Sequence, residues 1–273
     1  MGFFQRLSLG WRLAMDSLGV LRRDPELAVF PLVGGLAGAV YLALLLGGAA
    51  LVVGTDPGIL AWVVLFVLYL GSTFIASFFT AGLMHEARAS MEGREPSLAG
   101  GLRAAWRNAG TIFAWASIAA TVGVLLQVIR SDEGVLGDIL AGILSVGWSI
   151  LTYFVVPVIV FEDVSVTEAI RRSGDTFKRT WGETAGAHFG VGLVSILFTL
   201  VGLGLAAGVF VLVGGSPVGF LGAVAFAVLV VLVTVLFGQT LTGIAKTALY
   251  VFATEGREPE GFENVDFAHA RAR

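Results

Sequence analysis

Six long apolar segments, separated by short turns or by charged connections, dominate the pattern of hydrophobic and polar positions along the chain. A helix needs roughly 20 apolar residues to cross a hydrocarbon core of about 30 Å. The segments that meet or nearly meet this length are 27–53, 59–84, 111–129, 135–161, 185–213 and 218–245. Their only carboxylate or clear cation is Asp138, within one turn of a segment's start. Because long continuous runs lack the alternation of a barrel, the pattern predicts six transmembrane helices.

Basic residues are distributed unevenly between the two sides of these segments. The short turns at 55–58, 130–134 and 214–217 hold a single basic residue, Arg130, and the other 16 of the 17 lie in the remaining connections and at the termini. The positive-inside rule then predicts a multi-pass protein of the plasma membrane with both termini in the cytoplasm. The first apolar run is too long for a signal-peptide core, so we expect it to be retained as the first span.

Three connecting stretches, 3–21, 98–109 and 166–181, place apolar residues at helical spacings of three and four. Each stretch contains one tryptophan and several basic residues, a composition typical of helices lying on the inner leaflet. The alternative is that they pack on the bundle as structural elbows. The candidate lipid-interface residues are Trp11, Arg12, Trp106, Arg107, Arg171, Arg172, Lys178, Arg179 and Trp181.

The order of amphipathic helix, span, span occurs three times along the chain. The string Glu-Gly-Arg-Glu-Pro stands at 92–96 after the second span and again at 255–259 after the sixth, while Phe-Glu-Asp-Val-Ser holds the equivalent place at 161–165. The matching positions favour internal duplication. We therefore predict an all-α polytopic bundle, a single membrane domain over 1–254 with parallel repeats of about 1–91, 92–161 and 162–254, and a cytoplasmic tail over 255–273.

The even-numbered spans carry polar residues near one helix face. These residues either make hydroxyl contacts between helices or line a narrow polar cavity at the centre of the repeats. The cavity candidates are Tyr69, Thr73, Ser77, Ser145, Ser149, Thr152, Thr234 and Gln239.

Composition narrows the function classes further. Of the 273 residues, 56% are hydrophobic and 14% are charged, against about 25% charged in soluble domains, and mean hydropathy is +0.88. The net charge of −3 gives no indication of a nucleic-acid partner, and the absence of cysteine excludes disulfides and thiolate metal sites. His85-Glu86 lacks the second histidine of a zinc helix. We expect no enzymatic activity, no metal and no cofactor, and the charge-free spans argue against proton-coupled transport.

The segment Val156-Pro157-Val158-Ile159-Val160-Phe161-Glu162-Asp163, followed by Val166-Thr167-Glu168-Ala169-Ile170-Arg171-Arg172-Ser173 and Phe177-Lys178-Arg179-Thr180-Trp181, resembles uncharacterised prokaryotic six-helix membrane families. These families are similar in style to the membrane domain attached to some glycerophosphodiester phosphodiesterases. The resemblance implies a membrane protein and lends no catalytic residues, and this chain contains no phosphodiesterase domain.

Two functions remain open at this stage. The charge-free spans and basic helices favour a non-enzymatic protein that organises lipid or scaffolds partners at the cytoplasmic face. The repeats and polar stripes favour a transporter or channel for a neutral or amphiphilic solute. Membrane lipid is the expected partner, and the small-xxx-small pair Gly34–Gly38 fits either internal packing or a contact with a membrane protein or a second copy.

Overall fold

The computed structural model describes residues 3–52, 58–132, 134–179, 196, 200–205, 207–211, 217–263 and 265, and these residues contain helices and no strand. The elements are α1 (Phe3–Arg23), η1 (Pro25–Ala28), α2 (Val29–Val52), α3 (Gly58–Met91), α4 (Leu98–Arg107), α5 (Ala109–Asp132), α6 (Gly134–Leu151), α7 (Val155–Glu162), α8 (Val166–Arg179) and α10 (Pro217–Glu255). The all-α prediction is confirmed over this part of the chain.

Five helical stretches are long and apolar enough to cross a membrane. They are Pro25–Leu51, Gly58–Met91, Ala109–Ser131, Gly134–Glu162 and Val218–Glu255. They coincide with the first, second, third, fourth and sixth predicted segments. Of the fifth, 185–213, only residues 196, 200–205 and 207–211 are described, and these are helical. The rest of that segment lies outside the described residues, so the fifth span stays a prediction.

Two of these helices continue beyond the ends of their apolar segments. α3 ends at Met91 rather than near residue 84, and α10 ends at Glu255 rather than near residue 245. Hydropathy marks where the chain leaves the hydrocarbon, whereas a helix ends where the backbone turns. That turn comes at Gly93 and Gly256, which have φ angles of 71° and 68°. Glycine adopts this left-handed conformation without the steric cost of a side chain.

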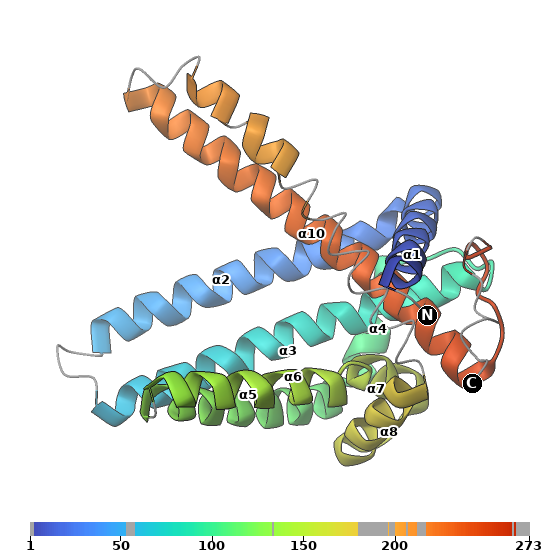
Figure 1. Cartoon of the computed structure of the whole chain (residues 1–273), viewed down its shortest axis with the longest axis horizontal. Coiled ribbons are helices and arrows are strands. Elements are labelled where there is room, and N and C mark those ends of the chain that lie inside the picture. Colours follow the sequence, from blue (N-terminus) through green and yellow to red (C-terminus); the bar gives the residue numbers. More distant parts are fainter. Residues whose placement is uncertain are drawn as a thin grey trace.

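The short helices gather at one end of the long ones. In Figure 1, α1, α7 and α8 lie at the end of the molecule that holds both termini, α5 runs beside α3, and α6 packs on α5. α2 and α10 meet near this end and diverge toward the other. We call it the charged end, comprising α1, α4, α8 and the last residues of α3 and α10.

The buried core lies at the charged end as well. It joins residues such as Leu13, Phe30, Ile112, Phe154 and Tyr250, which come from α1, α2, α5, the α6–α7 connection and α10. The other ends of the long helices are covered by exposed apolar side chains, with Leu44 72% exposed and Leu51 89% exposed. Exposed apolar surface on this scale is what a helix facing lipid presents.

The fourth apolar stretch is interrupted between α6 and α7. Pro157 lacks a backbone N–H, so it cannot complete the helical ladder one turn back. The chain leaves helical geometry between Leu151 and Val155. The backbone N–H of Phe154 turns outward and donates to Ser173 Oγ of α8 at 2.9 Å, in a fully buried setting. This hydrogen bond holds α8 against the connection between α6 and α7.

Candidate functional site

The arginines of α8 are paired with carboxylates. Arg171 donates to Glu168 at 2.7 and 2.9 Å, and Arg172 donates to Glu168 at 2.6 Å and also to Glu162. Hydrogen bonds from the two guanidinium groups lower the pKa of the Glu168 carboxyl to about 2. These carboxylates offset most of the positive charge that Arg171 and Arg172 bring to α8.

The end of α8 is more weakly compensated. Lys178 lies 4.0 Å from Asp175, and its side chain is 82% exposed. Arg179 is exposed at the last position of the helix. Trp181, the tryptophan predicted for this interface, falls outside the described residues.

α4 carries cations that no acid offsets. The helix contains no acidic residue, and neither Arg103 nor Arg107, both exposed, forms an ion pair with any residue that the structure describes. Trp106 between them is 73% exposed. Its ring meets Phe78 of α3 edge-on, with centroids 6.1 Å apart. α4 therefore presents a tryptophan and two uncompensated guanidinium groups at one surface.

Two polar residues fix where α4 starts. Ser97 is its N-cap and accepts a hydrogen bond from Gly100 N at 3.0 Å. The buried carboxylate of Glu86, on α3, accepts from the backbone N–H of Ser97 at 2.8 Å. Both bonds satisfy N–H groups that a helix start leaves free. They hold α4 against α3.

α1 contributes a second tryptophan and arginine pair. Trp11 is 43% exposed, and Arg12 beside it is exposed. Together with Met15 and Asp16 they line a shallow hollow. The opposite face of α1 is buried at Leu13 and neighbouring positions. The predicted interface residues of α1 and α4 thus stand on the surface of the charged end.

The two Glu-Gly-Arg-Glu-Pro copies lie side by side at this end. Arg257 of the second copy donates to Glu92 of the first at 3.0 Å. Arg88 bridges the copies, with its guanidinium 2.9 Å from Glu92 and 2.7 Å from Glu255. Partial burial acts to raise the pKa of Glu92, but hydrogen bonds from Arg94 and Arg88 outweigh it and lower that pKa. These ion pairs tie the end of α3 to the end of α10.

A cavity of about 600 Å³ lies between α2, α3 and α10. Three glycines of α2 line it: a Cβ at Gly34 would lie 2.9 Å from Phe79 of α3, so the two helices approach closely there, whereas a Cβ at Gly38 would meet no atom within 4 Å. Its lining comprises Pro31, Gly34, Gly35, Gly38, Leu42, Ser72, Ile75, Ala76, Phe79, Thr80, Leu83, Met84, Thr234, Val235, Gly238, Gln239, Thr242, Gly243 and Lys246. The cavity is thus mainly apolar, with polar groups from α3 and α10.

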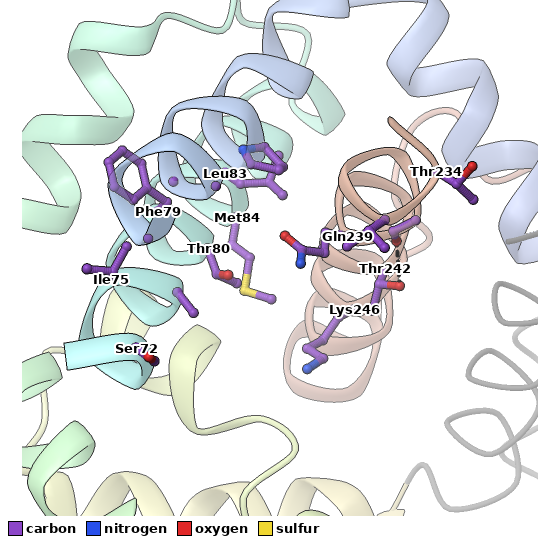
Figure 2. A pocket seen from close by; sticks show the side chains of 18 of the residues that line it. Ser72, Ile75, Phe79, Thr80, Leu83, Met84, Thr234, Gln239, Thr242 and Lys246 are labelled. Carbon is purple, nitrogen blue, oxygen red and sulfur yellow. Dashed lines mark hydrogen bonds between the residues drawn. The ribbon is translucent and has the colours of Figure 1, made fainter. Parts of the chain in front are cut away.

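Lys246 lines the end of this cavity that lies nearest the charged end. Its Nζ lies 4.1 Å from the centroid of the Tyr153 ring, a cation–π contact. It makes no ion pair within the described part of the chain. Figure 2 shows Gln239 directed from α10 toward Thr80 and Met84 of α3, across the cavity. The cavity therefore combines a cation and an amide with apolar walls.

Two of the eight residues predicted for a polar cavity, Thr234 and Gln239, line this one. The predicted face of α3 turns toward α5 instead. Ser77 Oγ accepts from Trp115 Nε1 at 3.2 Å, and the Tyr69 ring lies against Gly123. Thr73 is half-buried on the same helix and does not line the cavity.

The α6 residues are also directed elsewhere. Ser145 and Ser149 of α6, and Thr152 just after its end, donate to the carbonyls of Ala141, Ser145 and Trp148, each four residues back along the chain. The cavity lies between the first, second and sixth spans rather than among the three even-numbered ones. Sequence reasoning missed Lys246, although it stands seven residues after Gln239 and so on the same helix face.

No group of three or more metal-ligating His, Asp or Glu side chains occurs among the described residues. His85 lies 4.0 Å from Glu86, which already caps α4. His188 lies outside the described residues. The expectation that the chain is no enzyme is not tested by this arrangement and stays a prediction.

The long apolar helices and their exposed apolar side chains define a polytopic α-helical membrane protein. The profile of a family of unknown function, DUF6159, matches residues 59–261. The chain belongs to this family. No curated protein matches it.

Proposed function

We propose that this protein is a non-enzymatic membrane protein that organises anionic lipid at the cytoplasmic leaflet. The observation that carries the proposal is α4, where Trp106 is exposed between Arg103 and Arg107 and no described carboxylate pairs with either arginine. Tryptophan favours the headgroup level of a bilayer, and each arginine near an anionic surface contributes about 1 kcal/mol of attraction. α8 is a weaker candidate because Glu168 and Glu162 neutralise its arginines.

The proposal requires the charged end to lie in the cytoplasm. The distribution of basic residues supports this orientation. Because the chain has no cysteine, single-cysteine labelling tests it without background. We expect Asp56→Cys and Asp132→Cys to react with an impermeant thiol reagent from outside the cell and Arg94→Cys only after permeabilisation. Labelling of all three from one side would overturn the orientation.

Three parallel repeats also belong to this proposal. Glu92, Glu162 and Glu255 each stand at a helix end, and the residue after each has a positive φ: 71° at Gly93, 47° at Asp163 and 68° at Gly256. A common turn in three equivalent places supports duplication. The likeness of the α7–α8 segment to the membrane domain of some glycerophosphodiester phosphodiesterases remains a prediction.

Lipid enrichment around the reconstituted protein tests the proposed function. The full chain is placed in nanodiscs of phosphatidylglycerol and phosphatidylcholine, and retained lipids are counted by native mass spectrometry. Removing two cations by Arg103→Gln with Arg107→Gln should lower the preference for phosphatidylglycerol by about 2 kcal/mol, roughly thirtyfold. The double change Arg171→Gln with Lys178→Gln removes the same charge from residues that have acidic neighbours, and we expect a clearly smaller loss. Equal losses would refute α4 as the lipid site.

Transport or binding of an amphiphilic solute is the second candidate. The cavity between α2, α3 and α10 favours it, because a space of about 600 Å³ is of the size that takes small ligands.

A further inference from the structure

The cavity between α2, α3 and α10 holds a cation without a counter-ion. Lys246 lines it, contacts the Tyr153 ring, and pairs with no carboxylate among the residues that the structure describes. A charge surrounded by apolar helices is costly unless an opposite charge or hydrogen bonds compensate it. An anionic group on a ligand would supply that compensation.

A second polar group lines the same cavity farther from the charged end. Gln239 precedes Lys246 by two helical turns on the same face of α10, so their Cα atoms are roughly 10 Å apart along the axis. Its amide, directed across the cavity, makes no hydrogen bond to any described residue. A side-chain amide offers two donors and an acceptor. It can bind polar atoms, such as ester oxygens, that follow a charged head.

The remaining lining suits a hydrocarbon chain. Gly38 leaves room along α2, because a Cβ added there would meet no atom within 4 Å, and Leu42 and Val235 line the deeper part of the cavity, farther from Lys246. The lining of α10 from Thr234 to Lys246 rises roughly 18 Å at 1.5 Å per residue, so the space is elongated. Leu42 and Val235 are 37% and 49% exposed, so the deep part borders the bilayer hydrocarbon.

We propose that this cavity binds an amphiphile with a single anionic head, its phosphate or carboxylate at Lys246 and its alkyl chain between α2 and α10. The inference rests on the second candidate function, binding of an amphiphilic solute in this cavity, and names the chemistry of that solute; it concerns a different site from the surface of α4. Phospholipid and free fatty acid share this chemistry, and the probes below distinguish them.

The test measures equilibrium binding of three radiolabelled probes to the purified full chain in detergent: dioleoyl phosphatidate, palmitate and uncharged hexadecanol. Lys246→Met keeps an unbranched side chain of similar length but removes the positive charge, whereas Lys246→Arg retains the positive charge. We expect Lys246→Met to weaken the tighter anionic probe about tenfold or more, to leave hexadecanol within about twofold, and Lys246→Arg to stay close to wild type.

The cavity itself is tested by filling it. A Cβ added at Gly38 meets no atom within 4 Å, so Gly38→Leu occupies cavity space without a clash at the backbone. Gly48→Leu, on the same helix, is the matched control, because its Cβ is also free and it does not line the cavity. Gly38→Leu should weaken all three probes, and Gly48→Leu should weaken none.

Several outcomes would overturn the proposal. Unchanged anion binding by Lys246→Met would show that the lysine does not bind the anionic head, and unchanged binding by Gly38→Leu would show that the probes do not bind in the cavity. Hexadecanol binding as tightly as palmitate to the wild type would show a neutral ligand. Loss of phosphatidate binding in the Arg103→Gln, Arg107→Gln variant alone would place the anion on α4. If Lys246→Met fails to fold, the comparison of palmitate with hexadecanol on the wild type still tests the anionic head, and the glycine pair still tests the cavity.

Discussion

Replacing Ser173 by alanine tests how the broken fourth span is held together. Ser173 Oγ accepts the backbone N–H of Phe154 at 2.9 Å, and both residues have no exposed surface. The substitution removes the acceptor and leaves too little space for water to replace it. A buried N–H without a partner costs about 1–3 kcal/mol, so we expect a loss of about 2 kcal/mol.

Thermal unfolding in detergent, followed by near-ultraviolet circular dichroism, measures the change. For a chain of this length, a loss of about 2 kcal/mol in the free energy of unfolding lowers the Tm by roughly 4–8 °C. Amide exchange adds a local readout, because the Phe154 N–H should exchange faster in Ser173→Ala while amides in the middle of α5 stay unchanged.

Ser149→Ala is the matched control. Its hydroxyl, five residues before Phe154, donates to the Ser145 carbonyl of its own helix and is exposed, so its loss should cost less than about 0.5 kcal/mol. The reasoning fails if Ser173→Ala costs no more than Ser149→Ala, or if exchange at Phe154 does not change. Either result would mean that α8 is not fastened through this hydrogen bond.

Three further changes test other contacts. Gly101→Ala would place a Cβ 2.4 Å from the Phe30 ring, so we expect the free energy of unfolding in detergent to fall by about 1–3 kcal/mol. The control Gly110→Ala places a Cβ that meets no atom within 4 Å, and it should cost almost nothing. Equal effects of the two changes would contradict the close packing at Gly101. Asp163→Gly should raise stability by about 1 kcal/mol, since it relieves a φ of 47° and removes an anion from a helix C-terminus, and destabilisation would be the contrary result. Hydrogen bonds from two arginines lower the pKa of Glu168 from 4.5 to about 2. The ionised Glu168 therefore contributes to stability above pH 4.5, and this contribution is lost as the pH falls toward 2. Glu168→Gln should flatten the dependence of the unfolding free energy on pH in this range, and an unchanged dependence would refute the linkage.

The positions of the long helices could be predicted from hydropathy because lipid imposes a simple length requirement on an apolar run. Their ends could not, since they depend on a backbone turn. Polar residues such as His85, Glu86 and Arg88 follow residue 84 and mark where the chain leaves the hydrocarbon, but the helix continues to Met91, shortly before Gly93 takes a left-handed conformation. The same reasoning applies to α10, and its extension brings Lys246 into the cavity wall although the sequence places it just beyond the last span.

The cavity could be predicted only in part because helix rotation decides which face meets which neighbour. Thr234 and Gln239 lie where a polar stripe on α10 indicated. On α3, moving by one residue turns the side chain by 100°, so Ser72 lines the cavity while Thr73 beside it does not. Nothing in the spacing of polar residues shows whether α5 or α10 packs on a given side. That choice follows from the packing of apolar residues over the whole bundle.

Salt dependence separates the two proposed sites, because their uncompensated cations stand at different depths. Arg103 and Arg107 are exposed, so their attraction for anionic lipid is screened when the Debye length falls from about 10 Å at 0.1 M salt to about 3 Å at 1 M. Lys246 lines a cavity among apolar helices, where a bound anion at short range is screened much less. We expect the phosphatidylglycerol preference at α4 to fall several-fold between these salt concentrations, while binding of the tighter anionic probe in the cavity changes less than about twofold. If both quantities fell together, the anion would sit at the surface, and Lys246 would not be the group that holds it.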